Sequence, residues 1–193
     1  MRTSFRRVVL AGALVPLMSA CSGPHDASSN DTDSGPRFVT VIGEGDRKAA
    51  PILEGEDLDG RALSTSDFVG KVIVVNLWGQ WCAPCRAEAS VLKVVADEYA
   101  SRNVQFVGIV NKSDPEAAKA FNSSVGITYP SFADQGGALE LSFRTSLPTT
   151  AIPTTWVLDS QGRVAARIID PDLSKSTLSS VLNEVVEDDR PAK

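Results

Sequence analysis

The sequence predicts an α/β fold in which a central mixed β-sheet is flanked by helices. Two apolar runs rich in β-branched residues, 71–78 and 104–110, are separated by a helical pattern, and such a crossover places two strands parallel. Two further runs, 154–159 and 163–169, are joined by the tight turn 160–162 and therefore predict an antiparallel pair. Both kinds of pairing in a chain of single-domain length predict one mixed sheet with helices on both faces.

The remaining elements follow in order along the chain. Residues 51–64 predict an N-terminal β-hairpin around a turn at Asp59 and Gly60, and residues 64–70 predict a short helical turn. An inserted segment with two helical patterns lies between the β-α-β half and the β-β-α half. The helices are expected at 83–103, 113–126, 138–145 and 173–187, where apolar residues recur at helical spacing or capping residues mark the ends.

Residues 1–20 predict a lipoprotein signal peptide. A basic start, MRTSFRR, is followed by an apolar stretch too short to span a membrane, and then by Ser19, Ala20 and Cys21. This ending resembles the lipobox of bacterial lipoproteins, in which the cysteine becomes the lipidated first residue, although Met18 stands where Leu is more usual. The alternative is a plain signal peptide cut near the same place. Either way we expect an extracytoplasmic protein, and the lipobox implies anchoring to the bacterial cell membrane through Cys21.

The segment after the signal peptide, residues 21–49, is predicted to be a flexible tether, and the domain is predicted to span 50–190. Within the tether, RFVTVI is ambiguous and could form a short strand. The formal net charge is -5 with no basic block, which argues against a nucleic-acid partner. Removal of residues 1–20 takes away three arginines and no acids, so only the lipid would hold the protein to an anionic membrane.

Cys82 and Cys85 stand two residues apart, directly after the first buried strand. A zinc site needs about four ligands, and the chain offers only Cys21 and His25 besides this pair, so no metal is expected. An inert disulfide remains conceivable in an exported protein, yet so short a loop gains little stability from closure. Cys82 at a helix start would be stabilised as a thiolate, and Cys85 one turn later would be more buried, which favours a redox-active pair.

The motif W-C-A-P-C after a buried strand resembles the active site of the thioredoxin superfamily. The stretches VVNLWGQWCAPCRAE and AIPTTWVLDSQGRV, with the N-terminal hairpin and the connection at 114–137, most resemble its exported TlpA/ResA-like branch. The resemblance covers roughly residues 50–188 and implies a thioredoxin fold. It also implies a thiol–disulfide oxidoreductase that uses no cofactor.

The same resemblance assigns the site. Cys82 is implied as the nucleophile and Cys85 as the resolving thiol, joined as a redox disulfide. Pro153 is implied as the cis-proline that faces the disulfide, in preference to Pro148, because it directly precedes the strand TTWVLD. The flanking positions are Trp78, Trp81, Pro84, Ile152 and Glu88.

Three positions depart from thioredoxin or leave a role open. Asn76 stands where thioredoxin has a buried Asp, and this agrees with the TlpA/ResA-like branch. Ala83 stands where some members have Glu. Glu88 either complements the helix dipole as a first-turn acid or assists proton transfer. Trp156 is expected in the core rather than at a substrate surface.

Ile152 before the proline resembles thioredoxin, and apolar Ala83 adds no positive charge, so the sequence favours a reductase. The branch implies apocytochrome c as the client, cytochrome c maturation as the process, and a membrane thiol electron donor. We expect a monomer. The alternatives are an oxidase for secreted proteins, a thiol peroxidase, whose Pro and Thr/Ser pattern is absent, and a non-enzymatic binding lipoprotein, which would leave W-C-x-x-C unexplained.

Overall fold

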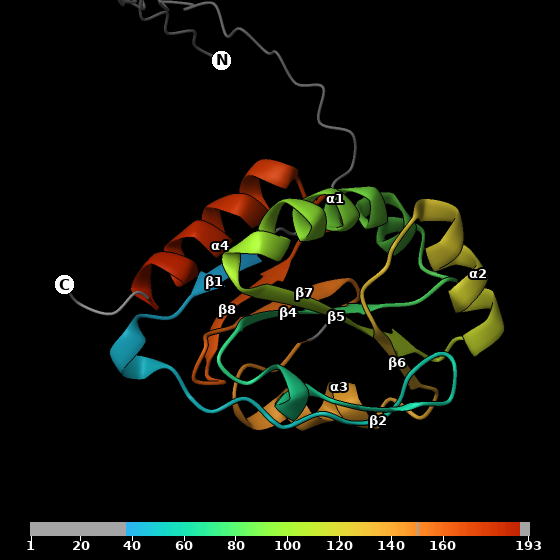
Figure 1. Cartoon of the computed structure of the whole chain (residues 1–193), viewed down its shortest axis with the longest axis horizontal. Helices are drawn as coiled ribbons and strands as arrows, with labels where there is room; N and C mark the ends of the chain where they lie inside the picture. Colours follow the sequence, from blue (N-terminus) through green and yellow to red (C-terminus); the bar gives the residue numbers. More distant parts are fainter. Residues whose placement is uncertain (1–37, 150, 190–193) are drawn as a thin grey trace, which may run out of the picture. The chain divides into compact units, whose positions relative to one another are not determined.

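The computed structural model describes residues 38–149 and 151–189, in which a six-stranded mixed sheet forms the centre (Figure 1). The strand order is β1-β8-β7-β4-β5-β6, with β4, β5 and β6 parallel and the other neighbours antiparallel. The strands are β1 (Phe38–Val41), β4 (Val72–Trp78), β5 (Val104–Asn111), β6 (Ser131–Asp134), β7 (Thr154–Leu158) and β8 (Val164–Ile169). A separate hairpin pairs β2 (Glu54–Glu56) with β3 (Ala62–Ser64).

The helices cover both faces of this sheet. Figure 1 shows α1 and α4 on one face, and α3 with the β2–β3 hairpin on the other. The α-helices are α1 (Ala83–Tyr99), α2 (Pro115–Val125), α3 (Ala138–Ser142) and α4 (Lys175–Asp188). Short 3-10 helices occupy Glu44–Asp46, Thr65–Phe68, Ala100–Arg102 and Phe143–Thr145. The predicted α/β class, with a mixed sheet between helices, is confirmed.

Local sequence signals explain where the helices begin and end. Asp114 caps α2 by accepting the Ala117 N–H, Pro115 is its first residue, and Gly126 ends it with a φ of 81°. Ser174 caps α4 by accepting the Thr177 N–H. In the hairpin, the Asp57 carboxylate accepts the backbone N–H groups of Asp59 and Arg61, which fixes the predicted turn.

Alternate residues of the buried strand β4 pack on opposite faces. Val72 and Val74 join the core under α1 and α4, whereas Ile73, Val75 and Leu77 join the core on the α3 side. Trp156 is fully buried in the second core, where its ring stacks on Phe143 at a centroid distance of 4.1 Å. Its predicted role as a core residue is therefore confirmed.

The predicted boundary between the flexible tether, residues 21–49, and the domain, which was expected to start at residue 50, is wrong. Phe38–Val41 pairs with β8 as the edge strand, so the ambiguous RFVTVI stretch does contribute a strand. Arg47 is buried and forms ion pairs with Asp159 at 3.4 Å and Asp188 at 2.5 Å. The boundary was missed because partners more than 100 residues away in the chain order this segment.

The calls on residues 1–20, on the first part of the tether and on Cys21 lie outside the described residues. Within the described part of the chain, no helix is both long enough and apolar enough to traverse a lipid bilayer. The strand β6 was not predicted, since the stretch around Ser131 was interpreted only as a connection.

Candidate active site

A disulfide between Cys82 and Cys85 lies where β4 ends and α1 begins. The S–S distance is 2.03 Å and the two Cα atoms are 5.3 Å apart. Cys82 is the N-cap of α1, and its sulfur accepts the backbone N–H of Cys85 at 3.2 Å. Pro84 occupies the first turn, where its missing N–H costs no helical hydrogen bond. The sequence therefore places the first cysteine at the helix start, as expected.

The position of Cys82 sets its chemistry in the reduced state. Unpaired N–H groups and the helix dipole at the start of α1 favour a thiolate there, and the first turn carries no acid to oppose it. Cys82 is 5% exposed and Cys85 is 2% exposed, so both are shielded in the disulfide form. As expected, Cys85 is more buried than Cys82, but the exposed fractions of the two side chains differ little.

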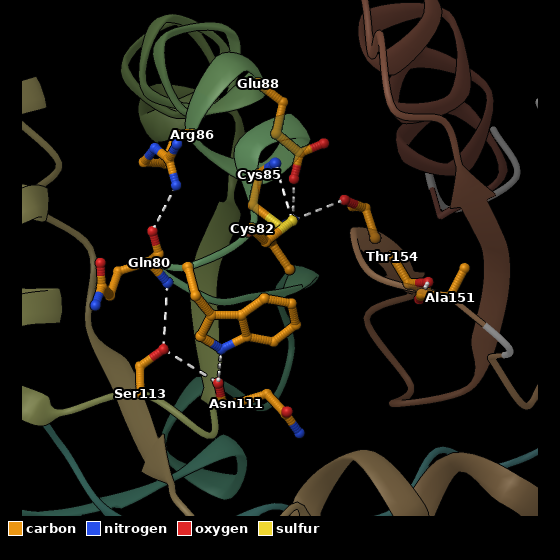
Figure 2. Close-up of a disulfide and its surroundings, with 12 residues drawn as sticks. Gln80, Cys82, Cys85, Arg86, Glu88, Asn111, Ser113, Ala151 and Thr154 are labelled. Atoms are coloured by element: carbon orange, nitrogen blue, oxygen red, sulfur yellow. Dashed lines mark hydrogen bonds between the residues drawn. A yellow bond between two sulfur atoms is a disulfide. The ribbon is translucent and has the colours of Figure 1, made fainter. Parts of the chain in front are cut away.

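The loop before β7 faces this disulfide. The Ile152–Pro153 peptide bond is cis, at the position that the resemblance implies rather than at Pro148. Ile152 packs against the cluster that contains Trp78, Cys82 and Cys85. Figure 2 shows the Thr154 side chain, next to this proline, pointing toward the disulfide.

The two flanking tryptophans differ in environment. Trp81 is 53% exposed, and its indole N–H donates to the Asn111 carbonyl at 3.2 Å. Trp78 is buried, with its ring 5.5 Å from that of Phe121 on α2. Trp81 is therefore exposed near the disulfide, whereas Trp78 packs in the buried cluster that contains Cys82 and Cys85.

Glu88 is not the first-turn acid that one interpretation proposed. It is the sixth residue of α1 and only 3% exposed, and Figure 2 shows its carboxyl group pointing toward the disulfide. The Asn76 side-chain amide donates to the Glu88 carboxyl at 2.9 Å and contacts the Thr155 hydroxyl at 3.2 Å. The dipole interpretation is wrong because Glu88 lies beyond the first turn and faces the sheet.

Burial raises the pKa of Glu88 to about 8, partly opposed by the Asn76 hydrogen bond and reinforced by the negative charge of Asp170. Asp170 is buried immediately after β8. Sequence analysis missed Asp170, although an acid directly after a buried strand was a usable signal. A buried carboxyl group with a pKa near neutrality can hold or release a proton beside the two sulfurs.

Within residues 38–149 and 151–189, no three His, Cys, Asp or Glu side chains gather in a way that could hold a metal ion. The disulfide at the start of α1 supports exchange between dithiol and disulfide at Cys82 and Cys85.

Comparisons with known proteins agree with this geometry. The Redoxin family model matches residues 32–185. The chain is 26% identical over 138 residues to the "Thiol-disulfide oxidoreductase ResA" of Bacillus thuringiensis, covering 72% of this chain and 77% of that protein. It is 32% identical over 127 residues to the "Thiol:disulfide interchange protein HelX" of Rhodobacter capsulatus, covering 64% and 68%.

A solved structure of a DsbF homologue from Corynebacterium diphtheriae is also similar. It superposes with a TM-score of 0.70 at 33% identity, covering 76% of this chain and 92% of that one. The matched region contains the fold and the disulfide described above, so the family assignment rests on the whole domain rather than on a short motif. The chain belongs to the Redoxin family and is a TlpA/ResA-like thiol–disulfide oxidoreductase of the thioredoxin superfamily.

Proposed function

We propose that this oxidoreductase is a disulfide reductase that works outside the cytoplasm, anchored to the cell membrane by a lipid on Cys21. Its proposed client is apocytochrome c, and its electrons come from a membrane thiol protein. The observation that carries the proposal is the placement of Cys82 at the start of α1 beside the cis-Pro153 loop. Apolar Ala83 and Ile152 support the reducing direction, because neither adds a positive charge that would favour the thiolate.

The exchange needs both cysteines in sequence. In the reduced protein, the Cys82 thiolate attacks one sulfur of the client disulfide, forming a mixed disulfide and releasing the other client sulfur as a thiolate. Cys85 then loses its proton and attacks the Cys82 sulfur, which forms the Cys82–Cys85 bond seen here and releases the second client sulfur. The client gains two electrons and the protein loses two.

Glu88 is proposed to take the Cys85 proton in this second step. Its pKa of about 8 lets Glu88 hold or release a proton near neutral pH, and its carboxyl group points toward the disulfide. When the membrane donor reduces the disulfide again, Glu88 returns that proton to the departing Cys85 sulfur. A single buried carboxyl group then serves both half-reactions.

The reduction potential, measured by equilibration with glutathione, tests the direction. A reductase is expected near the roughly −270 mV of thioredoxin, whereas a value near the roughly −120 mV of DsbA would overturn the proposal in favour of an oxidase. A disulfide peptide containing Cys-x-x-Cys-His tests the client. The reduced protein should open it, and failure to do so would contradict the proposed client.

Anchoring is tested separately in cells that express the full chain. The wild-type protein should fractionate with the membrane, and Cys21→Ser should abolish that attachment. A wild-type protein recovered entirely in the soluble fraction would contradict the lipid anchor.

A further inference from the structure

The loop that carries Trp81 into the active site is held by a second loop, residues 111–113, which begins at the last residue of β5. The Gln80 backbone N–H donates to the Ser113 hydroxyl at 3.2 Å, and that hydroxyl donates to the Asn111 carbonyl at 3.1 Å. The same carbonyl accepts the Trp81 indole N–H at 3.2 Å. Figure 2 shows Gln80, Ser113 and Asn111 linked by these contacts beside Cys82. The 111–113 loop thus fixes both the backbone and the side chain next to Cys82.

The 111–113 loop is itself ordered by contacts from the inserted segment. The Asn111 side-chain amide donates to Glu140 of α3 at 2.8 Å, and the Lys112 N–H donates to the Asp134 carbonyl at 3.2 Å. Lys112 has a φ of 47°, which an L-residue with a long side chain adopts at a cost on the order of 1 kcal/mol. Asn111 and Ser113 are both buried. Apolar residues could fill this space without buried polar groups and without a strained backbone. The presence of both therefore indicates that the conformation of the 111–113 loop is fixed by its own residues.

Trp81 is confined from two further directions. A Cβ atom on Gly79 would lie 2.6 Å from the Trp81 indole nitrogen, so the ring occupies space that only glycine leaves open. Arg86 of α1 donates to the Gln80 carbonyl at 2.8 Å and holds the loop from its other side. The exposed part of the indole therefore has a fixed orientation beside the disulfide.

We propose that Asn111 and Ser113 are positioning residues that hold Trp81 as a docking surface for the client polypeptide. The inference rests on the proposed function, because it assumes that a polypeptide docks beside Cys82 during exchange. Neither residue belongs to the cysteine and Glu88 chemistry. Their loss should weaken client binding while leaving the reactivity of the disulfide unchanged.

The test compares Ser113→Ala with wild type, with Ser113→Thr as the conservative rescue and with Ser123→Ala, at an exposed position of α2, as the matched control. Losing the Ser113 hydroxyl removes its hydrogen bonds to Gln80 and Asn111, so the KM for an oxidised Cys-x-x-Cys-His peptide should rise about three- to tenfold. The kcat, the rate with the small disulfide 5,5′-dithiobis(2-nitrobenzoate) and the reduction potential should stay at wild-type values. Ser113→Thr should restore the KM.

A second measurement needs no client. Trp78 and Trp156 are buried, so acrylamide quenching of tryptophan fluorescence reports mainly on Trp81. Ser113→Ala should increase quenching, and Ser113→Thr and Ser123→Ala should not. Unchanged quenching in Ser113→Ala would overturn the inference, as would a small-disulfide rate or potential that falls along with peptide reduction. If wild type fails to reduce the peptide, the proposed client is wrong, while the quenching comparison still decides whether Ser113 positions Trp81.

Discussion

The side-chain amide of Asn76 on β4 donates a 2.9 Å hydrogen bond to the buried carboxyl group of Glu88 on α1. Asn76 stands where the resemblance to thioredoxin implies a buried Asp, so the strand itself carries no carboxyl group at this position. The structure instead supplies a carboxyl group from the helix and a neutral amide from the strand to hold it. Burial raises the pKa of Glu88 to about 8. We therefore expect its titration to change both the rate of disulfide reduction and the free energy of unfolding between neutral and mildly alkaline pH.

Glu88→Gln should slow reduction of the disulfide by dithiothreitol, because the amide cannot donate a proton to the departing Cys85 sulfur. At pH 6.5 Glu88 holds its proton, and the wild-type rate should exceed that of the variant by about a hundredfold. Above about pH 8 wild-type Glu88 has lost that proton, so the difference should narrow. Stopped-flow fluorescence across pH 6 to 9 measures this, and a constant ratio over the range would exclude Glu88 as the proton donor.

The same substitution should change how stability depends on pH. Unfolded Glu88 titrates near its ordinary value of 4.5 and folded Glu88 near 8, so between these values the folded state holds the extra proton. This contribution to the free energy of unfolding is complete below pH 4.5 and is lost as pH rises through about 8, by an amount on the order of a few kcal/mol. Urea unfolding of Glu88→Gln should lack this decline, whereas Glu184→Gln, at an exposed position of α4, should retain it.

Asn76→Ala should raise the pKa of Glu88 further, because the hydrogen bond that stabilises its charged form is removed. The buried carboxyl group loses a partner, and the free energy of unfolding should fall by about 1–3 kcal/mol. Carbon-13 NMR of labelled glutamate measures the pKa directly. Thr155→Val breaks only the second Asn76 contact and is the control; an equal pKa change in both variants would show that the Asn76–Glu88 bond is not the cause.

Arg47→Ala should destabilise the domain by about 3 kcal/mol or more, because it leaves buried Asp159 without one of its ion-pair partners. Arg61→Ala is the matched control: Arg61 forms surface ion pairs with Asp57 and Asp59, and its loss should change the denaturant midpoint much less than loss of Arg47 does. A second comparison uses two shortened chains, one starting at Phe38 and one at Ala50. The chain that starts at Ala50 lacks β1 and Arg47, so it should have the lower denaturant midpoint. Equal denaturant midpoints for the two chains would contradict the assignment of Phe38–Val41 and Arg47 to the fold.

Much of the fold was predictable because its signals are local. Four signals each indicate the local conformation within a few residues: the apolar run of β4, the Asp114 cap, Gly126 and the hairpin turn at Asp59 and Gly60. Cys82 was placed at a helix start by its local sequence, whereas the cis-Pro153 loop was implied by the resemblance to the thioredoxin superfamily.

Except for Asp170, the missed features depend on contacts between separate elements of the fold. Phe38–Val41 forms a strand because β8 offers an edge, and Ser131–Asp134 does so because β5 does. The Asn76–Glu88 bond and the contact between Gln80 and Ser113 join side chains and backbone of different elements. No periodicity or spacing encodes such pairs, so only the folded arrangement reveals them.

In the proposed exchange, Cys82 attacks the client and Cys85 resolves the mixed disulfide. The direct measurement is trapping: Cys85→Ser and Cys82→Ser variants are expressed in cells, and mixed disulfides are separated by non-reducing electrophoresis. Cys85→Ser should accumulate reducible complexes linked through Cys82, and Cys82→Ser should accumulate few. Complexes formed only by Cys82→Ser, or by neither variant, would contradict the account.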